Sequence, residues 1–293
     1  MQGPRFAMQP SRTPCPVLHP DALDTLEGAT VSRFGLTHDA ITETAARSIA
    51  ELALGMFDGD GSSRRGSRAN TLRGSVTAST LTAAQVTPVI VVLAGDNTTG
   101  ARAVAAARHL VTRNTKIIIA EAQYESATTQ DEQMAKQTSM LKKMLRNGAA
   151  IKRGTWRKAS NYIKNLSGPP AVIIDALLAG TTYSDLPAEA QQEAREMIDW
   201  ANRSRAPVLS IGCPSGASGL DGTATTVEGE PLAVRSDRVL ALGMPVLGLL
   251  EAMKSGERWN VNVADIGINI ALKAEEAVAF GGAWTSRLAF IEG

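Results

Sequence analysis

Between residues 88 and 264, short apolar runs alternate with amphipathic stretches of helical length, and few folds accommodate such an order. The apolar runs predict strands and the stretches between them predict helices. Strands are expected at 88–94, 116–120, 149–152, 171–176, 207–211, 238–242 and 259–264, and helices at 98–112, about 128–147, about 155–166, 187–204 and 246–254. This order predicts an α/β fold of three layers, in which helices cover both faces of a mostly parallel sheet.

Two helices are predicted ahead of the sheet, at 20–27 and 37–57. The chain shows no internal repeat and no second composition class, so residues 17–293 are expected to form one domain with a helical N-terminal extension. Residues 1–16 are polar and contain prolines, which predicts a flexible leader. Residues 58–80 are rich in Gly, Ser and Arg and predict a disordered insertion. A solvated insertion is favoured there over a regulatory or RNA-binding segment.

Composition excludes several classes of protein. The formal net charge of +1 argues against a strongly basic nucleic-acid binder, and no apolar run is long enough to span a membrane. The two cysteines show no pairing pattern and the three histidines are scattered, so no metal site is predicted. The first residues do not resemble a signal peptide. We therefore expect a cytoplasmic protein without membrane contact.

Candidate ligand-binding residues follow the strands, because ligands of open parallel sheets bind beyond the carboxyl ends of the strands. Three such ends are informative. The candidates are Gly95, Asp96, Asn97, Thr98, Thr99 and Gly100 after the first strand, Asp175 at the end of a middle strand, and Pro214, Ser215 and Gly216 after a later one. All are expected to face one cleft.

The turn at 95–100 has the spacing of a phosphate-binding loop without its Lys and Ser/Thr, because Ala101 and Arg102 follow Gly100. One interpretation is an anion site, in which backbone N–H groups at the start of the next helix hold a phosphate. The other is a tight strand-to-helix turn that Asn97 caps. Both interpretations are open at this point.

Two further residues could carry chemistry. Asp175 ends the apolar run 171–174, where burial would perturb its pKa and suit it to general acid/base work, or else it is a carboxylate that accepts backbone hydrogen bonds. The second interpretation is favoured, because no partner base is near in the sequence. Cys213 could be a nucleophile, but without a histidine partner it is better interpreted as a small buried side chain.

A basic segment spans residues 141–166, which contain no acidic residue. Trp156 and Tyr162 lie within it, so RNA could bind there through phosphate contacts and base stacking. The alternative is an ordinary solvated helix face. The RNA-binding candidates are Lys142, Lys143, Arg146, Lys152, Arg153, Arg157 and Lys158.

The sequence resembles the YjeF N-terminal domain family over roughly residues 17–280. The blocks that carry the resemblance are 43–47 (Glu-Thr-Ala-Ala-Arg), 106–110, 174–176, 214–216, 242–245 and 263–268 (Val-Ala-Asp-Ile-Gly-Ile). The resemblance implies a Rossmann-like three-layer α/β/α sandwich.

One branch of the family epimerises hydrated nicotinamide dinucleotides, with an Asn/Gly/Asp-rich turn, an aspartate after a middle strand and a lysine after a late one. Here Asp175 matches the aspartate. The chain departs from the pattern where Thr98 and Thr99 replace asparagines, Arg102 and Gly212 replace acids, and Val246 replaces the lysine. These departures imply that most of the proton-transfer groups are missing.

A second branch, the C-terminal domain of the enhancer of mRNA decapping 3 scaffold, matches more closely, especially through the run from Trp200 to Ile211. This resemblance implies a non-catalytic, homodimerising domain of cytoplasmic mRNA-decay granules (P-bodies). Its implied partners are a second copy, RNA, and mRNA-decay proteins bound through the full-length scaffold. It needs no cofactor, although an NAD-like or adenine nucleotide could occupy the pocket. NAD(P)H-hydrate epimerase is the alternative function.

Dimerisation has a weak sequence signal of its own. The N-terminal helices carry more large apolar side chains than one sheet face needs, and core packing explains them equally well. These side chains are Leu18, Leu23, Leu26, Phe34, Leu52, Met56 and Phe57.

Overall fold

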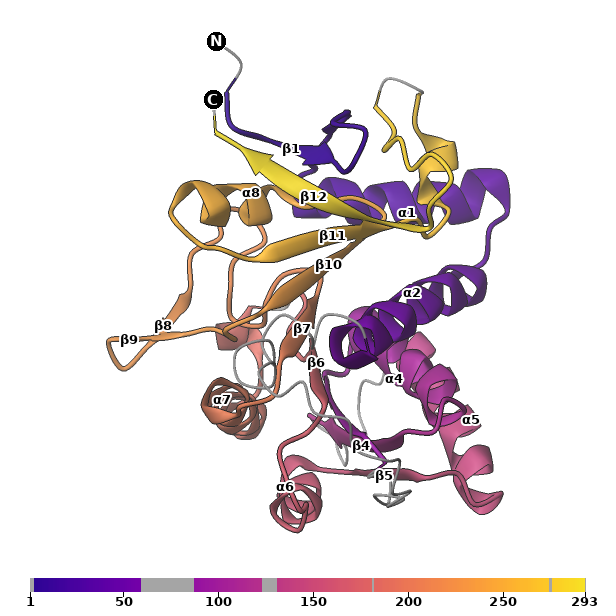
Figure 1. Ribbon diagram of the computed structural model, residues 1–293, viewed down its shortest axis with the longest axis vertical. Coiled ribbons are helices and arrows are strands. Elements are labelled where there is room, and N and C mark those ends of the chain that lie inside the picture. The colour runs from indigo at the N-terminus through magenta and orange to yellow at the C-terminus, as the bar shows by residue number, and fades with distance from the viewer. Residues whose placement is uncertain (1–2, 59–86, 123–130, 181, 274–275, 293) are drawn as a thin grey trace, which may run out of the picture.

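The computed structural model describes residues 3–58, 87–122, 131–180, 182–273 and 276–292. Its centre is a run of seven parallel strands in the order β11-β10-β7-β6-β3-β4-β5 (Figure 1). The strands are β3 (Val89–Ala94), β4 (Lys116–Glu121), β5 (Ile151–Gly154), β6 (Val172–Ala176), β7 (Val208–Ile211), β10 (Arg238–Leu242) and β11 (Asn260–Ala264). The prediction of a mostly parallel, Rossmann-like α/β fold is confirmed.

Helices cover both faces of this sheet (Figure 1). On one face lie α2 (His38–Asp58), α4 (Thr98–Val111) and α5 (Glu132–Arg146), and on the other lie α6 (Trp156–Lys164) and α7 (Ala188–Arg203). Alanines such as Ala103, Ala106 and Ala107 are fully buried in α4, and their small side chains let α2 pack closely across it. Each face of the sheet thus has its own apolar core beneath its helices.

The chain order creates a switch point between β3 and β6. From β3 the chain moves outward to β4 and β5, then returns to β6 on the opposite side of β3 and continues to β7, β10 and β11. In such sheets a crevice opens at the carboxyl ends of the strands where the direction reverses. The turn at 95–97 and the loop after Ala176 lie at this point.

The first helix is longer than predicted. The helix α1 runs over Pro20–Phe34, and Gly35 ends it in the left-handed region, with φ 73° and its N–H donating to Val31. The sequence predicted that this helix ends at Glu27. The last two turns instead pack on a short 3-10 helix, η2 (Ile268–Ala271), with Thr30 donating to the carbonyl of Ile268.

The prediction of a flexible leader at 1–16 is wrong for the described part of that segment. Residues Arg5–Met8 form β1, which pairs antiparallel with β12 (Thr285–Ile291), and Pro14–Cys15 forms β2 beside it. Phe6 and Met8 are fully buried. These strands extend the sheet beyond β11. The nearby sequence does not predict them, because β1 forms by pairing with β12 at the other end of the chain.

Other elements lie at the strand connections. They are η1 (Tyr183–Asp185), α8 (Leu247–Lys254) and a small separate hairpin of β8 (Thr225–Val227) and β9 (Glu230–Leu232). Residues 59–80 of the insertion predicted at 58–80 lie outside the described residues, as do residues 128–130 of the helix predicted at about 128–147, which corresponds to α5. Among the described residues, no helix combines the length and apolar character needed to cross a bilayer.

The apolar side chains of the N-terminal helices are mostly accounted for by the core. Leu26 is buried, and Leu18, Leu23, Leu52, Met56 and Phe57 pack against the core on the α2 side of the sheet. Phe34 differs, because about half of it (49%) is exposed at the end of α1. Core packing is therefore the better explanation of this set.

Candidate functional site

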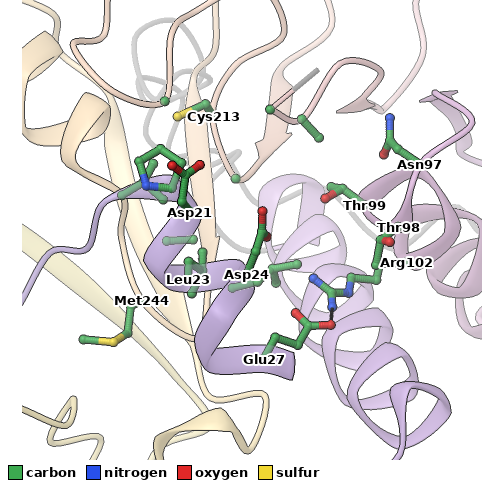
Figure 2. A pocket seen from close by; sticks show the side chains of 18 of the residues that line it. Asp21, Leu23, Asp24, Glu27, Asn97, Thr98, Thr99, Arg102, Cys213 and Met244 are labelled. Atoms are coloured by element: carbon green, nitrogen blue, oxygen red, sulfur yellow. Dashed lines mark hydrogen bonds and ion pairs between the residues drawn. The ribbon is translucent and has the colours of Figure 1, made fainter. Parts of the chain in front are cut away.

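A cavity of about 560 Å³ lies at the carboxyl ends of the parallel strands, within the size range of small-molecule sites (Figure 2). One wall is the helix α1 and the opposite wall is the start of α4. The lining residues are Pro20, Asp21, Leu23, Asp24, Glu27 and Gly28 of α1, His38 of α2, Asn97, Thr98, Thr99 and Arg102 around the start of α4, and Ala179, Gly180, Gly212, Cys213, Gly219, Ala241, Leu242, Met244, Val246 and Leu249 from β10, α8 and the loops.

The turn after β3 joins two strand ends. The Asn97 side chain caps α4 by accepting from the N–H of Gly100 at 2.8 Å, and its amide nitrogen donates to the carbonyl oxygen of Leu177 at 3.1 Å. A Cβ on Gly95 would overlap that same Leu177 oxygen, and a Cβ on Gly100 would overlap the carbonyl oxygen of Gly95. Gly95 therefore lets the β3 turn touch the β6 loop, and Gly100 lets the start of α4 close against Gly95, which explains the two glycines without a bound phosphate.

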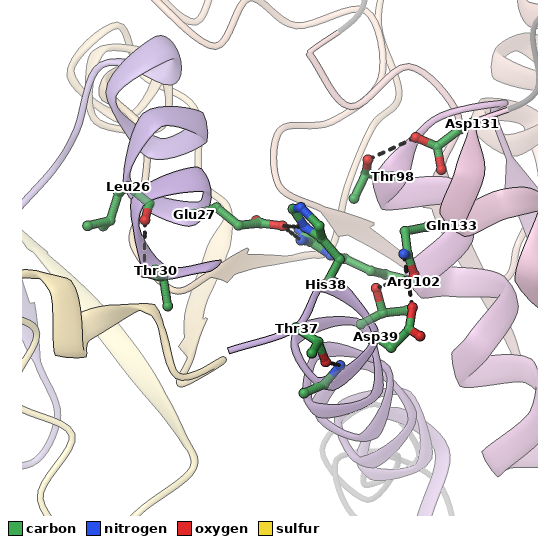
Figure 3. Close-up of polar contacts among 12 residues, drawn as sticks. Leu26, Glu27, Thr30, Thr37, His38, Asp39, Thr98, Arg102, Asp131 and Gln133 are labelled. Carbon is green, nitrogen blue, oxygen red and sulfur yellow. Dashed lines mark hydrogen bonds and ion pairs between the residues drawn. The ribbon is translucent and has the colours of Figure 1, made fainter. Parts of the chain in front are cut away.

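Thr98 and Asp96 turn toward α5. The Thr98 hydroxyl donates to Asp131 at 3.0 Å (Figure 3), and Asp96 accepts from the N–H of Asp131, also at 3.0 Å. Asp131 in turn caps α5 through the N–H of Met134. Burial raises the pKa of Asp96, and the nearby Asp131 carboxylate adds to that effect. Asp96 lines a separate cavity of about 60 Å³ and does not reach the large one.

Arg102 spans the gap between α4 and α1. Its guanidinium donates to the carboxylate of Glu27, and the Nδ1 atom of His38 lies 3.6 Å from the same carboxylate oxygen (Figures 2 and 3). The side chains of Arg102 and Glu27 are only 8% and 15% exposed. The pair thus joins the two walls of the cavity in a largely water-free place.

Three carboxylates of α1 face the cavity at intervals of three residues: Asp21, Asp24 and Glu27. Burial raises the pKa of Asp24, and the charges of Glu27 and Asp21 raise it further, while Arg102 opposes them. The cavity wall is therefore acidic on the α1 side. Sequence reasoning missed these residues, although the i, i+3, i+6 spacing of acids on one helix face was a usable signal.

Asp175 does not line the cavity. It is fully buried, and the β6–β7 register places it beside Ser210, whose hydroxyl donates to it at 2.6 Å. Its carboxylate also accepts from the hydroxyl of Ser215 at 2.6 Å and from the N–H groups of Ser215 and Leu177 at 2.9 and 3.4 Å. Burial raises the pKa of Asp175, and these hydrogen bonds oppose the rise. The favoured interpretation, a carboxylate that accepts local hydrogen bonds, agrees with this geometry.

The predicted Pro214–Ser215–Gly216 segment serves the same network. The Ser215 hydroxyl that donates to Asp175 also accepts from the N–H of Leu178 at 2.9 Å, so it ties the β6 loop to the β7 loop. Gly216 has φ 89°, and its position lies against the backbone of Leu232. None of the three residues lines the large cavity. Their role in the described structure is to hold two loops together.

Cys213 lines the cavity but is 8% exposed. Burial raises the pKa of its thiol to about 12, so it stays protonated at neutral pH and is a poor nucleophile. The described wall contains no lysine. Within the described ranges, no group of three or more His, Cys, Asp or Glu side chains could hold a metal ion.

The basic segment lies at the β5 edge of the sheet. Lys142, Lys143 and Arg146 are exposed on α5, Lys152 is exposed on β5, and Arg157 and Lys158 are exposed on α6. We call these six residues the β5-edge basic surface. The ammonium of Lys152 lies 4.5 Å from the centre of the Tyr162 ring.

Two members predicted for this surface are not on it. Arg153 is buried, and its guanidinium binds both carboxylate oxygens of Glu121 and the hydroxyl of Thr138. Trp156 is also buried and packs on Trp200, with ring centres 5.6 Å apart. Along β5, alternate side chains point to opposite faces, so Lys152 is exposed where Arg153 is not. A base could stack on neither buried group.

The model of the family described as YjeF-related protein N-terminus matches residues 38–248. Bifunctional NAD(P)H-hydrate repair enzyme Nnr of Salinibacter ruber is 24% identical over 261 residues, which cover 86% of this chain and 41% of the relative. Enhancer of mRNA-decapping protein 3 of Saccharomyces cerevisiae is 29% identical over 164 residues, which cover 54% of this chain and 28% of the relative. The chain thus spans less than half the length of each of these relatives.

Among solved structures, the yeast protein ynu0, YNL200c, superposes with a TM-score of 0.57 at 14% identity, covering 85% of this chain and 88% of that one. At this identity the likeness concerns the fold.

Proposed function

The chain belongs to the YjeF-related protein N-terminus family, and we propose that within it the protein is a non-catalytic, self-associating scaffold module of an mRNA-decapping activator. In this proposal it acts in cytoplasmic mRNA-decay assemblies (P-bodies), binds RNA at the β5-edge basic surface, and holds a small nucleotide-like ligand in the large cavity without converting it. Self-association would raise the local concentration of whatever the rest of the scaffold binds.

The placement of Asp175 carries the non-catalytic part of the proposal. It is the chain's match to the aspartate of the epimerising branch, yet its carboxylate is fully buried and engaged by four hydrogen bonds outside the cavity. A general acid or base must come within hydrogen-bond reach of the proton that it moves. Among the described residues that line the cavity there is no lysine, and Arg102 is paired with Glu27.

NAD(P)H-hydrate epimerase is the second candidate, and its support is the Salinibacter relative, whose similarity covers more of this chain than that of the decapping protein. The two functions are separated by incubating the purified protein with the resolved epimers of hydrated NADH. We expect no interconversion above the rate without protein. Interconversion that Asp175→Asn abolishes would establish the epimerase instead.

The scaffold function predicts a defined self-association. Light scattering at micromolar protein concentration and physiological salt is expected to give the mass of a dimer. Because a C2 dimer buries the same patch on both copies, the mass should not rise further with concentration. A monomer throughout the micromolar range would contradict the scaffold proposal, and this result is independent of any ligand in the cavity.

The β5-edge basic surface gives a third prediction. The combined variant Lys142→Gln, Lys143→Gln, Lys152→Gln is expected to weaken binding to single-stranded RNA several-fold and to reduce the slope of log affinity against log salt by about 2, at roughly 0.7 per lost phosphate contact. Fluorescence anisotropy with labelled homopolymers at several salt concentrations measures both quantities.

A matched control removes three charges far from the β5 edge, with Lys254→Gln, Arg258→Gln and Lys273→Gln. These exposed residues lie near α8, β11 and η2. Both variants have the same net charge, so a loss confined to the first assigns the RNA contact to the β5 edge. An equal loss in both would show a general charge effect and contradict the assignment.

A further inference from the structure

Arg102 is a buried cation in the wall of a cavity that is acidic on its α1 side. The residue is 6% exposed, and Figure 2 shows its side chain reaching from α4 toward Glu27 on α1. Its Nη2 atom donates to Glu27, whereas its buried Nε–H has no hydrogen-bond partner among the described residues. Arginine offers five donors in a planar fork, and a buried donor left unpaired is costly. The guanidinium therefore has binding capacity that the protein alone does not use.

Glu27, the partner of Arg102, is a side chain that a ligand could displace. Glu27 belongs to a different helix, lies beside the cavity, and has the Nδ1 atom of His38 as a second neighbour at 3.6 Å. Carboxylate and phosphate present similar oxygens to a guanidinium, and both can bind its fork through two parallel hydrogen bonds. An anionic group of a ligand could thus take the place of the Glu27 carboxylate while Arg102 stays neutralised. Glu27 would then keep His38 as its neighbour.

We propose that Arg102 is the residue by which the cavity recognises an anionic group of its ligand, and that Glu27 is a built-in competitor for the same position. The ligand class is a nucleotide-like molecule with one phosphate monoester. This inference deepens the ligand-binding part of the proposed function and rests on it.

The acids of α1 set the limit of one phosphate. Asp21 and Asp24 stand on the same face as Glu27, so a displaced Glu27 leaves three carboxylates around the cavity. Against them the described wall offers the positive charge of Arg102, the imidazole of His38 and the N-terminal end of α4, whose partial positive charge comes from the helix dipole. The positive charge of Arg102 and about half a charge from the helix end come close to the roughly −1.5 to −2 charges of one phosphate monoester, so they can offset one such group. A triphosphate would place further negative charge against the carboxylates of α1.

The test compares AMP, adenosine, ATP and inorganic phosphate by isothermal titration calorimetry. Wild-type protein is expected to bind AMP more tightly than adenosine or ATP, with inorganic phosphate competing weakly against AMP. Glu27→Gln removes the competitor and should tighten AMP binding about tenfold, with adenosine unchanged. The double variant Glu27→Gln, Arg102→Gln leaves no buried charge unpaired, so it should stay folded and bind AMP no better than adenosine.

Asp24→Asn is the matched control, because it removes the same charge from the same helix face without touching Arg102. A purely electrostatic role of α1 would make Asp24→Asn and Glu27→Gln equal in their effect on AMP, which would overturn the inference. A preference for AMP over adenosine that survives in the double variant would overturn it as well. If none of the probes bound to wild type or to Glu27→Gln, the inference would also be overturned. The scaffold proposal is tested separately, by the mass from light scattering.

Discussion

Gly95→Ala is expected to destabilise the protein by more than about 3 kcal/mol, because the added methyl group would meet backbone atoms of Leu177 as well as the Asn97 amide. A Cβ at this position overlaps the carbonyl oxygen of Leu177 and lies 3.0 Å from its carbonyl carbon. Relief would require the β3 turn and the β6 loop to move apart, which would break the bond from the Asn97 amide to Leu177. Urea denaturation followed by circular dichroism measures the change.

Gly28→Ala is the control for this substitution. Gly28 lies within α1, and a Cβ there has no atom within 4 Å. Alanine in place of glycine inside a helix is expected to stabilise by about 0.5–1 kcal/mol. If Gly95→Ala changed the free energy of unfolding as little as this control does, the close contact between the two loops would not hold in solution.

Asp175→Ala is expected to lower the free energy of unfolding by about 2–5 kcal/mol, since it strands buried donors at about 1–3 kcal/mol each. The N–H groups of Ser215 and Leu177 lose their acceptor, while the Ser210 hydroxyl can still bond to Ser236. The exposed Asp185 gives the control, because Asp185→Ala should change stability by less than about 0.5 kcal/mol. Equal stability of the two variants would contradict the structural role of Asp175 and reopen a catalytic one.

The charge of Asp175 adds a pH dependence of predictable sign. Burial raises its pKa in the folded state above the ordinary value of 3.8. Between these two values the folded state holds the proton more tightly than the unfolded state, so the stability due to this group falls as pH rises. Wild-type protein is therefore expected to lose stability relative to Asp175→Asn as pH rises above 3.8. If the difference in unfolding free energy between the two proteins stayed constant through the acid and neutral range, the raised pKa of Asp175 would be contradicted.

Much of the central sheet could be predicted from the chain alone. The apolar runs at 88–94 and 171–176 became β3 and β6 with shifts of one residue, because a strand buried on both faces needs an unbroken apolar run. The edge elements could not be predicted this way. In β1, only Phe6, Ala7 and Met8 are buried, and the strand forms by pairing with residues near the other end of the chain.

The residues of the candidate site were also predicted only in part. Asn97, Thr98 and Thr99 were found because they follow a strand, and they do line the cavity. Asp175 and Ser215 were chosen for their place at strand ends as well, yet the hydroxyl and N–H of Ser215 donate to the Asp175 carboxylate in the interior. Position after a strand gives the edge of the sheet but not the direction of a side chain, which depends on register and on the neighbouring loop.

The sequence by itself determined the parallel α/β sheet, the glycine-bounded turn after its first strand and the family to which the chain belongs, because these depend on periodicity and on residues close together in the chain. Only the tertiary structure decided that Arg153 is buried against Glu121, that Asp175 is locked away from the cavity, and that Glu27 faces Arg102. Each of these depends on a contact between elements 32 or more residues apart, and burial and pairing of charges are set by such contacts.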